Sequence, residues 1–123
     1  MNRAVMDTAA AMIEAMLSVV RADEPVSSIA DAAVRTTAER GMAAWAWPFG
    51  APGYSGHGIG CWLDEPPRLR SGEVGRLAAG MVLVLEARLG RTGHSGAALT
   101  DPVLVTPAGA ERLSRTPLRT WPA

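Results

Sequence analysis

The sequence contains no lysine and a single cysteine, and its formal net charge is zero. The lack of lysine excludes chemistry through a Schiff base on a lysine side chain. A lone cysteine cannot form a disulfide within the chain, so a reducing compartment and a cytoplasmic location are expected. Because Cys61 has no base beside it in the sequence, we predict that it is a buried structural thiol.

Long apolar runs and blocks of like charge are also absent. No stretch of eighteen apolar residues occurs, so no membrane span is expected. Asp7 and Glu14 interrupt the apolar N-terminal stretch, which is therefore typical of an amphipathic helix rather than of a signal peptide. Without a basic block there is no electrostatic footprint for nucleic acid.

Periodicity predicts two helices at the start of a single domain that covers residues 1–123. The polar residues of the segment 2–22 repeat at helical spacing, and the apolar face is wide enough to be buried on more than one side, within the domain or against another chain. A second helix is expected over Ile29 to Arg40. Ser28 and Asp31 resemble a capping box at its start, and Gly41 suits its end.

The later half favours strands. Residues 81–89 read as a strand buried on both faces, and residues 99–106 as another in which Pro102 implies a bulge or an edge. Residues 48–60 are rich in Gly and Pro and predict a loop, and residues 110–113 predict a short turn of helix. The fold class is therefore α+β, with helices on one face of a mainly antiparallel sheet.

Four phrases in order identify a resemblance. They are GHGIG (56–60), EPPRL (65–69), GMVLVLE (80–86) and TDPVLVTPAGAERLSR (100–115). Together they resemble the second half of the "pita-bread" family, which includes aminopeptidase P, prolidase, methionine aminopeptidase and creatinase. The resemblance implies a half pita-bread domain, with two N-terminal helices packed on a curved sheet.

The family's site holds two metal ions on two Asp, one His and two Glu. By resemblance, His57 matches the ligand His and Glu86 the first ligand Glu. The second ligand Glu falls on Thr100, the family's nearby Arg on Ala98, and its catalytic His on Asp64. Both ligand Asp would precede residue 1. Two of five ligands would hold at best one ion weakly, so we expect no metal, no cofactor and no active metallopeptidase.

The same resemblance predicts a homodimer. The full fold has two related halves, and a lone half would expose its sheet edge and the apolar face of the first helix. A second copy in place of the other half would cover both surfaces.

The candidate catalytic residues are His57, Glu65, Glu86 and Asp64. The imidazole of His57 is of a residue type that suits general acid–base catalysis, although a former ligand making only a structural hydrogen bond fits equally. Glu86 lies on an apolar strand, so it is either paired or functional. Glu65 suits proton transfer if it faces the pocket. Asp64 beside it is either part of the same site or simply a solvated carboxylate.

The candidate substrate-binding residues are Trp45, Trp47, Trp62, His94 and Thr100. The three tryptophans lie close to His57 in sequence and suggest a wall for a small aromatic ligand, although core or interface positions are the more common use of such residues. His94 falls at the tip of an expected hairpin, where an exposed histidine is the default.

Three functions from different classes fit these residues. The first is a metal-independent enzyme that catalyses a condensation, cyclisation or isomerisation of a small aromatic substrate, an indole among the candidates. A Pictet–Spengler-type ring closure in a biosynthetic pathway is an example. The second is a non-catalytic module that binds a protein or ligand. The third, a hydrolase with a reduced metal site completed across a dimer, is disfavoured by Thr100, Ala98 and Asp64.

Overall fold

A computed structural model describes residues 3–48 and 53–119 of the chain. Two helices and a short 3-10 helix precede five strands. In chain order the elements are α1 (Arg3–Val19), α2 (Ser27–Glu39), η1 (Ala43–Trp45), β1 (Gly56–Gly58), β2 (Glu65–Arg68), β3 (Val82–Gly90), β4 (Gly96–Thr106) and β5 (Gly109–Arg112).

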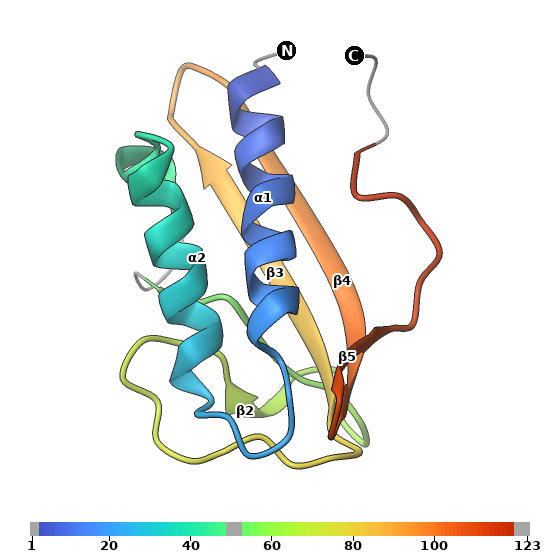
Figure 1. The fold of residues 1–123 in the computed structure, drawn as a ribbon. Coiled ribbons are helices and arrows are strands. Elements are labelled where there is room, and N and C mark those ends of the chain that lie inside the picture. Colours follow the sequence, from blue (N-terminus) through green and yellow to red (C-terminus); the bar gives the residue numbers. More distant parts are fainter. Residues whose placement is uncertain (1–2, 49–52, 120–123) are drawn as a thin grey trace.

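The strands form one antiparallel sheet in the order β2-β1-β3-β4-β5. The long hairpin of β3 and β4 is its centre, and α1 and α2 lie across one face (Figure 1). The expected α+β architecture, with helices on one face of an antiparallel sheet, is confirmed. None of the helices in the described ranges is long and apolar enough to cross a membrane.

The wide apolar face of α1 is used within the chain. The helix packs on α2, β3, β4 and β5, and eight of its residues are buried. Small side chains such as Ala9 and Ala10 let it approach both α2 and the sheet, while Met12, Ile13 and Met16 fill the core. This width therefore does not require a second chain.

Local details of the helices and of β5 differ from the sequence-based expectation. Helix α2 begins earlier, with Val26 as its N-cap and no side-chain cap. The Ser28 hydroxyl instead donates to the carbonyl oxygen of Pro25, 2.7 Å away, so the capping box is wrong. The short helix at residues 110–113 is also wrong, because β5 pairs with the end of β4 across a tight turn at Pro107 and Ala108.

The segment 48–60, expected to be a loop, ends in a strand. Gly56 to Gly58 form β1, which pairs with both β2 and β3. Gly56 has a φ of 135°, and a Cβ there would overlap the carbonyl oxygen of Val84. Glycine is thus required for β1 to approach β3 closely enough to pair with it.

Pro102 causes no break in β4, since the register with β3 runs uninterrupted. The carbonyl of Pro102 accepts a hydrogen bond from the Leu113 amide, just past the end of β5. In a strand the N–H and C=O of one residue point to the same side, so the N–H that proline lacks would also point towards this open end. Pro102 therefore lies at a local edge. The predicted burial of Cys61 is wrong, because this residue is exposed in the loop between β1 and β2.

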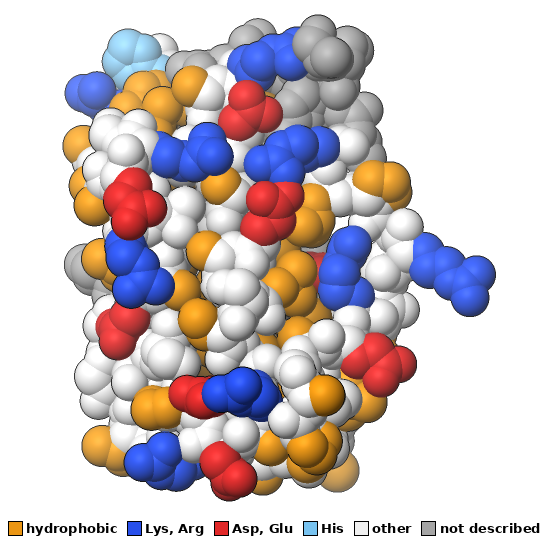
Figure 2. Space-filling view, in the orientation of Figure 1, with side chains coloured by type: hydrophobic (Ala, Val, Ile, Leu, Met, Phe, Trp, Pro, Cys, Tyr) orange, Lys and Arg blue, Asp and Glu red, His pale blue; other side chains and the backbone are white. Residues whose placement is uncertain are grey.

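Alternation along β3 defines the two faces of the sheet. Leu83, Leu85, Ala87 and Leu89 are buried in the core that the helices cover. Glu86 and Arg88 alternate with them and therefore point to the face that no helix covers. On the helix-bearing side, acidic and basic side chains are interspersed and no field of one sign forms (Figure 2).

Candidate functional site

A buried histidine–carboxylate pair lies on the open face of the sheet. His57 is on β1 and Glu86 on β3, and both residues are 8% exposed. The Nε2 atom of His57 lies 3.3 Å from Oε1 of Glu86. Pairing of Gly56 with Leu85 and of His57 with Val84 sets this distance, because it places His57 diagonally next to Glu86 on the same face.

The hydrogen bond on the other side of the His57 ring fixes what this pair can do. Nδ1 lies 2.8 Å from the carbonyl oxygen of Gly58, which can only accept, so Nδ1 carries the proton. A carboxylate oxygen also only accepts. The approach of Nε2 to Glu86 is therefore favourable when a cation, either a proton or a metal ion, lies between them. His57 and Glu86, here called the proton-holding pair, can share one exchangeable proton in this arrangement.

Three further polar residues surround this pair. The guanidinium of Arg88 lies 3.2 Å from Oε2 of Glu86. Burial raises the pKa of the Tyr54 phenol, the negative charge of Glu86 raises it further, and Arg68 and Arg88 oppose both effects. Sequence reasoning missed Tyr54, Arg68 and Arg88. The spacing of two between Glu86 and Arg88 on one strand was a signal for Arg88.

The other two candidate carboxylates have partners elsewhere. Asp64 forms an ion pair with Arg68, and its side chain is half exposed. Glu65 accepts a hydrogen bond from the backbone N–H of Trp62 at 3.2 Å, and its carboxylate lies close against Gly60. Of the four predicted catalytic residues, the structure brings together His57 and Glu86, whereas Glu65 braces the β1–β2 loop.

The three tryptophans do not form one wall. Trp45 and Trp47 flank the far end of β3, where Ala46 bridges Leu89, while Trp62 follows β1 at the opposite end of the strand. These ends are roughly 20 Å apart at about 3.3 Å per residue. Trp62 is 73% exposed, and the indole N–H of Trp47 donates to the carbonyl of Tyr54.

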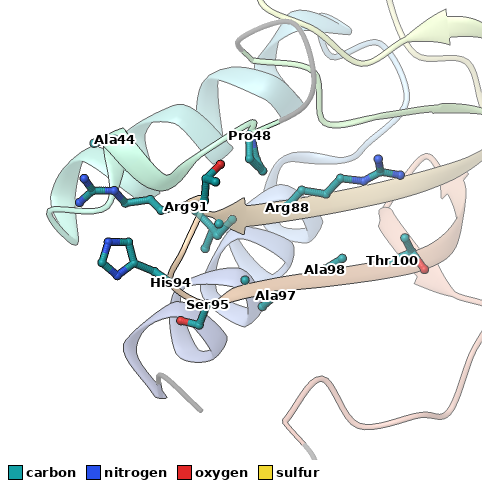
Figure 3. Close-up of a pocket in the computed structure, with 13 residues that line it drawn as sticks. Ala44, Pro48, Arg88, Arg91, His94, Ser95, Ala97, Ala98 and Thr100 are labelled. Carbon is teal, nitrogen blue, oxygen red and sulfur yellow. The ribbon is translucent and has the colours of Figure 1, made fainter.

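A groove of about 920 Å³ runs along the β3–β4 hairpin. Figure 3 shows Arg91 and His94 at the hairpin turn, Arg88 farther along β3, and Thr100 on β4. His94 is confirmed at the tip of this hairpin. The groove adjoins the proton-holding pair through two of its lining residues. Arg88 forms an ion pair with Glu86, and Thr100 on β4 is the cross-strand partner of Glu86 on β3.

The pairing of Glu86 with Thr100 also tests the fit of a two-metal centre. His57 and Glu86 have a favourable arrangement for one ion, since the Nδ1 hydrogen bond leaves Nε2 facing the carboxylate. Thr100, the neighbour of Glu86 on this face, offers a hydroxyl and no carboxylate. Within residues 3–48 and 53–119, no group of three or more His, Cys, Asp or Glu could hold a metal. The described residues therefore do not fit a dinuclear centre by themselves.

Comparison with known proteins agrees with this fold. The model of metallopeptidase family M24 matches residues 1–107, which is most of the chain. The protein therefore belongs to metallopeptidase family M24, the family that the four sequence phrases indicated. No match is found among curated proteins.

Solved structures of that family share the architecture. Dipeptidase PepE from Mycobacterium ulcerans is 28% identical, with a TM-score of 0.82 over 91% of this chain and 29% of that one. The X-Pro aminopeptidase from Thermotoga maritima is 20% identical, with a TM-score of 0.86 over 95% and 32% of the two chains. A methionine aminopeptidase from Rickettsia prowazekii is 19% identical, with a TM-score of 0.69 over 89% and 49%. The chain thus spans less than half the length of each of these proteins.

Proposed function

We propose that this protein is an acid–base enzyme in which His57 and Glu86 move a proton on a small molecule held in the adjoining groove. The 3.3 Å approach of Nε2 of His57 to the buried Glu86 carboxylate, with Nδ1 held by the Gly58 carbonyl, is the observation that carries this proposal. General acid–base groups need such a proton within hydrogen-bond reach of the substrate. Each of the two side chains is about 10% exposed, which leaves a small accessible surface for that contact.

Reactions whose bond changes are driven by proton transfer suit this pair better than amide hydrolysis does. Hydrolysis needs an activated water and a group that stabilises an oxyanion, a role that metal ions fill in dinuclear sites. Condensation, cyclisation and isomerisation need a proton delivered to one atom and removed from another. The finer proposal is such a reaction in a biosynthetic pathway, without a metal or another cofactor, of which a Pictet–Spengler-type closure is an example.

A small aromatic substrate, an indole amine for instance, is part of this proposal. Its support is narrower than the sequence suggested, because the Trp45 ring contacts the groove residues Arg91 and His94, whereas Trp62 lies at the opposite end of β3. The ring of Trp45 lies 5.9 Å from that of His94, at a tilt of 53°. A planar ligand in the groove would contact His94, whose ring packs against that of Trp45.

Turnover and binding should be measured on the same set of variants. The purified protein is incubated with indole amines plus an aldehyde or keto acid, and with proline dipeptides plus divalent metals, and products are detected by mass spectrometry. Glu86→Gln and His57→Gln remove the proton-holding pair. Glu111→Gln makes the same chemical change at an exposed position on β5 and is the matched control.

The outcomes separate the candidate functions. Product from the aromatic panel that disappears in Glu86→Gln and His57→Gln, but not in Glu111→Gln, supports the proposal. Thermal stabilisation by a ligand without turnover by any panel member points instead to a binding module. Metal-dependent cleavage of a dipeptide contradicts the proposal directly.

A homodimer is a separate proposal. Edge strand β2 is preceded by an exposed loop in which Trp62 is 73% and Leu63 81% exposed. Large apolar side chains at a sheet edge are typical of surfaces that a partner covers. Sedimentation at micromolar concentration should show a dimer that Leu63→Glu disrupts. If the unaltered protein sediments as a monomer, the proposal of a homodimer is refuted.

A further inference from the structure

The groove along the β3–β4 hairpin has a distinct charge. Its lining includes the cationic side chains of Arg88 and Arg91 and the imidazole of His94, and none of the lining residues that the structure describes is Asp or Glu. Three residues with hydroxyl groups, Thr92, Ser95 and Thr100, also line the groove. Guanidinium and imidazole groups with nearby hydroxyls favour an anionic ligand.

The cationic groups at the turn are held in place by an aromatic ring. The guanidinium carbon of Arg91 lies 5.5 Å from the centroid of the Trp45 ring, and His94 packs against the same ring. Backbone hydrogen bonds join Arg91 to Ser95 and His94 to Arg91 across the turn. Within the described ranges, no carboxylate forms an ion pair with Arg91. Its donors are therefore available to a ligand.

The shape of the groove fits a small organic molecule. Its walls carry small residues on both strands, namely Gly90, Gly96, Ala97 and Ala98, whose short side chains leave room beside the hairpin. Figure 3 shows Ala97 and Ala98 on β4. A volume of about 920 Å³ lies near the upper end of the usual range for small-molecule sites. A ligand of that size reaches from Arg91 to Arg88, which already contacts one carboxylate, that of Glu86.

We propose that this groove binds a small organic acid, with the ligand's carboxylate on Arg91 and His94 and its body directed along the hairpin towards Arg88 and Glu86. The inference deepens the proposed function and rests on it only for this orientation, which places the ligand's far end beside the proton-holding pair. Binding of the carboxylate itself is independent of catalysis.

The test compares an acid with its neutral counterpart. Isothermal titration measures binding of indole-3-acetate and indole-3-acetamide, and of benzoate and benzamide, to the intact chain. Charge-assisted hydrogen bonds predict that each acid binds about tenfold tighter than its amide. Arg91→Gln should abolish this preference. Arg35→Gln removes an exposed arginine on α2, on the other side of the sheet, and should leave the preference unchanged.

Several results would overturn the inference. They are equal affinity for acid and amide, no binding of either acid at millimolar concentration, or a preference that survives Arg91→Gln. Competition by inorganic phosphate as effective as that by the acids would assign the site to phosphate-bearing ligands instead. The acid preference of Glu86→Gln tests binding separately from turnover. If the unaltered enzyme prefers the acid but turns over no substrate, the binding site stands and the catalytic role is refuted.

Discussion

Replacing Glu86 with leucine should leave the fold nearly as stable as before while removing the proton-holding pair. Functional groups are placed for chemistry rather than for stability, so their loss often costs little free energy of unfolding. The neighbours of Glu86 allow this expectation to be worked out term by term.

The losses are small because both partners have alternatives. Arg88 has a side chain that is 55% exposed, so its ion pair with Glu86 is screened and contributes at most about 1 kcal/mol. His57 keeps its bond to Gly58 and loses a partner at Nε2, which costs about 1–2 kcal/mol at a buried atom. Leucine beside Val84 and Pro102 gains roughly 1.5–3 kcal/mol by burial. These terms nearly cancel, and the net change should be within about 1 kcal/mol.

Urea denaturation followed by tryptophan fluorescence measures this change, with the m-value as a check that the unfolded state is unaltered. Glu111→Leu, at an exposed position on β5, serves as the control for the new side chain. A loss of more than about 3 kcal/mol in Glu86→Leu, of the size seen when a buried structural pair is broken, would refute the reasoning. The pair would then be a structural element of the sheet rather than a site.

Three other predictions address separate parts of the molecule. Arg112→Leu should lower the free energy of unfolding by about 2–4 kcal/mol in urea, because Asp101, which is 2% exposed and bound by Arg112 at 2.7 Å, would be left unpaired; an equal loss in Arg112→Lys would argue against an ionic cause. Gly56→Ala should prevent folding or cost more than about 2 kcal/mol, since the new methyl group would overlap a backbone oxygen of β3, and full stability by circular dichroism would contradict the geometry. Tyr54 is the only tyrosine, so absorbance at 295 nm reports its pKa directly. The pKa should exceed 10.0, and the stability that the raised value contributes should be lost as pH rises above that point; titration at or below 10.0 in the folded protein would contradict it.

The sequence predicted the fold well where one interaction decided the outcome. The apolar run of residues 81–89 and the order of the phrases placed β3 and β4, and helical spacing placed α1. The expected burial of β3 on both faces is wrong, because its core side chains lie on the helix-facing side and Arg88 on the other side is exposed. Sequence reasoning failed where a distant partner decided. β5 forms because β4 offers a free edge, and β1 forms because Gly56 lets the backbone approach β3.

The site shows the same division. His57 and Glu86 were predictable from the phrases that contain them, and the sheet register brings them together. Nearness in sequence misled for the tryptophans, because the chain from Trp45 to Trp62 runs the length of β3 and separates its ends. Arg91 was not predicted at all. Its role depends on a contact with Trp45 across two segments, and no short pattern records such a contact.

The pairing of Thr100 with Glu86 bears on how this protein could change. The two residues face each other across adjacent strands, at the separation of about 4.5–5.5 Å between Cβ atoms that such partners have. A single substitution, Thr100→Glu, would set a second carboxylate next to Glu86 and His57 without altering the backbone. The backbone geometry at this point therefore already suits a richer donor set than the side chains supply. One substitution would thus place three potential metal ligands, His57, Glu86 and residue 100, on one face of the sheet.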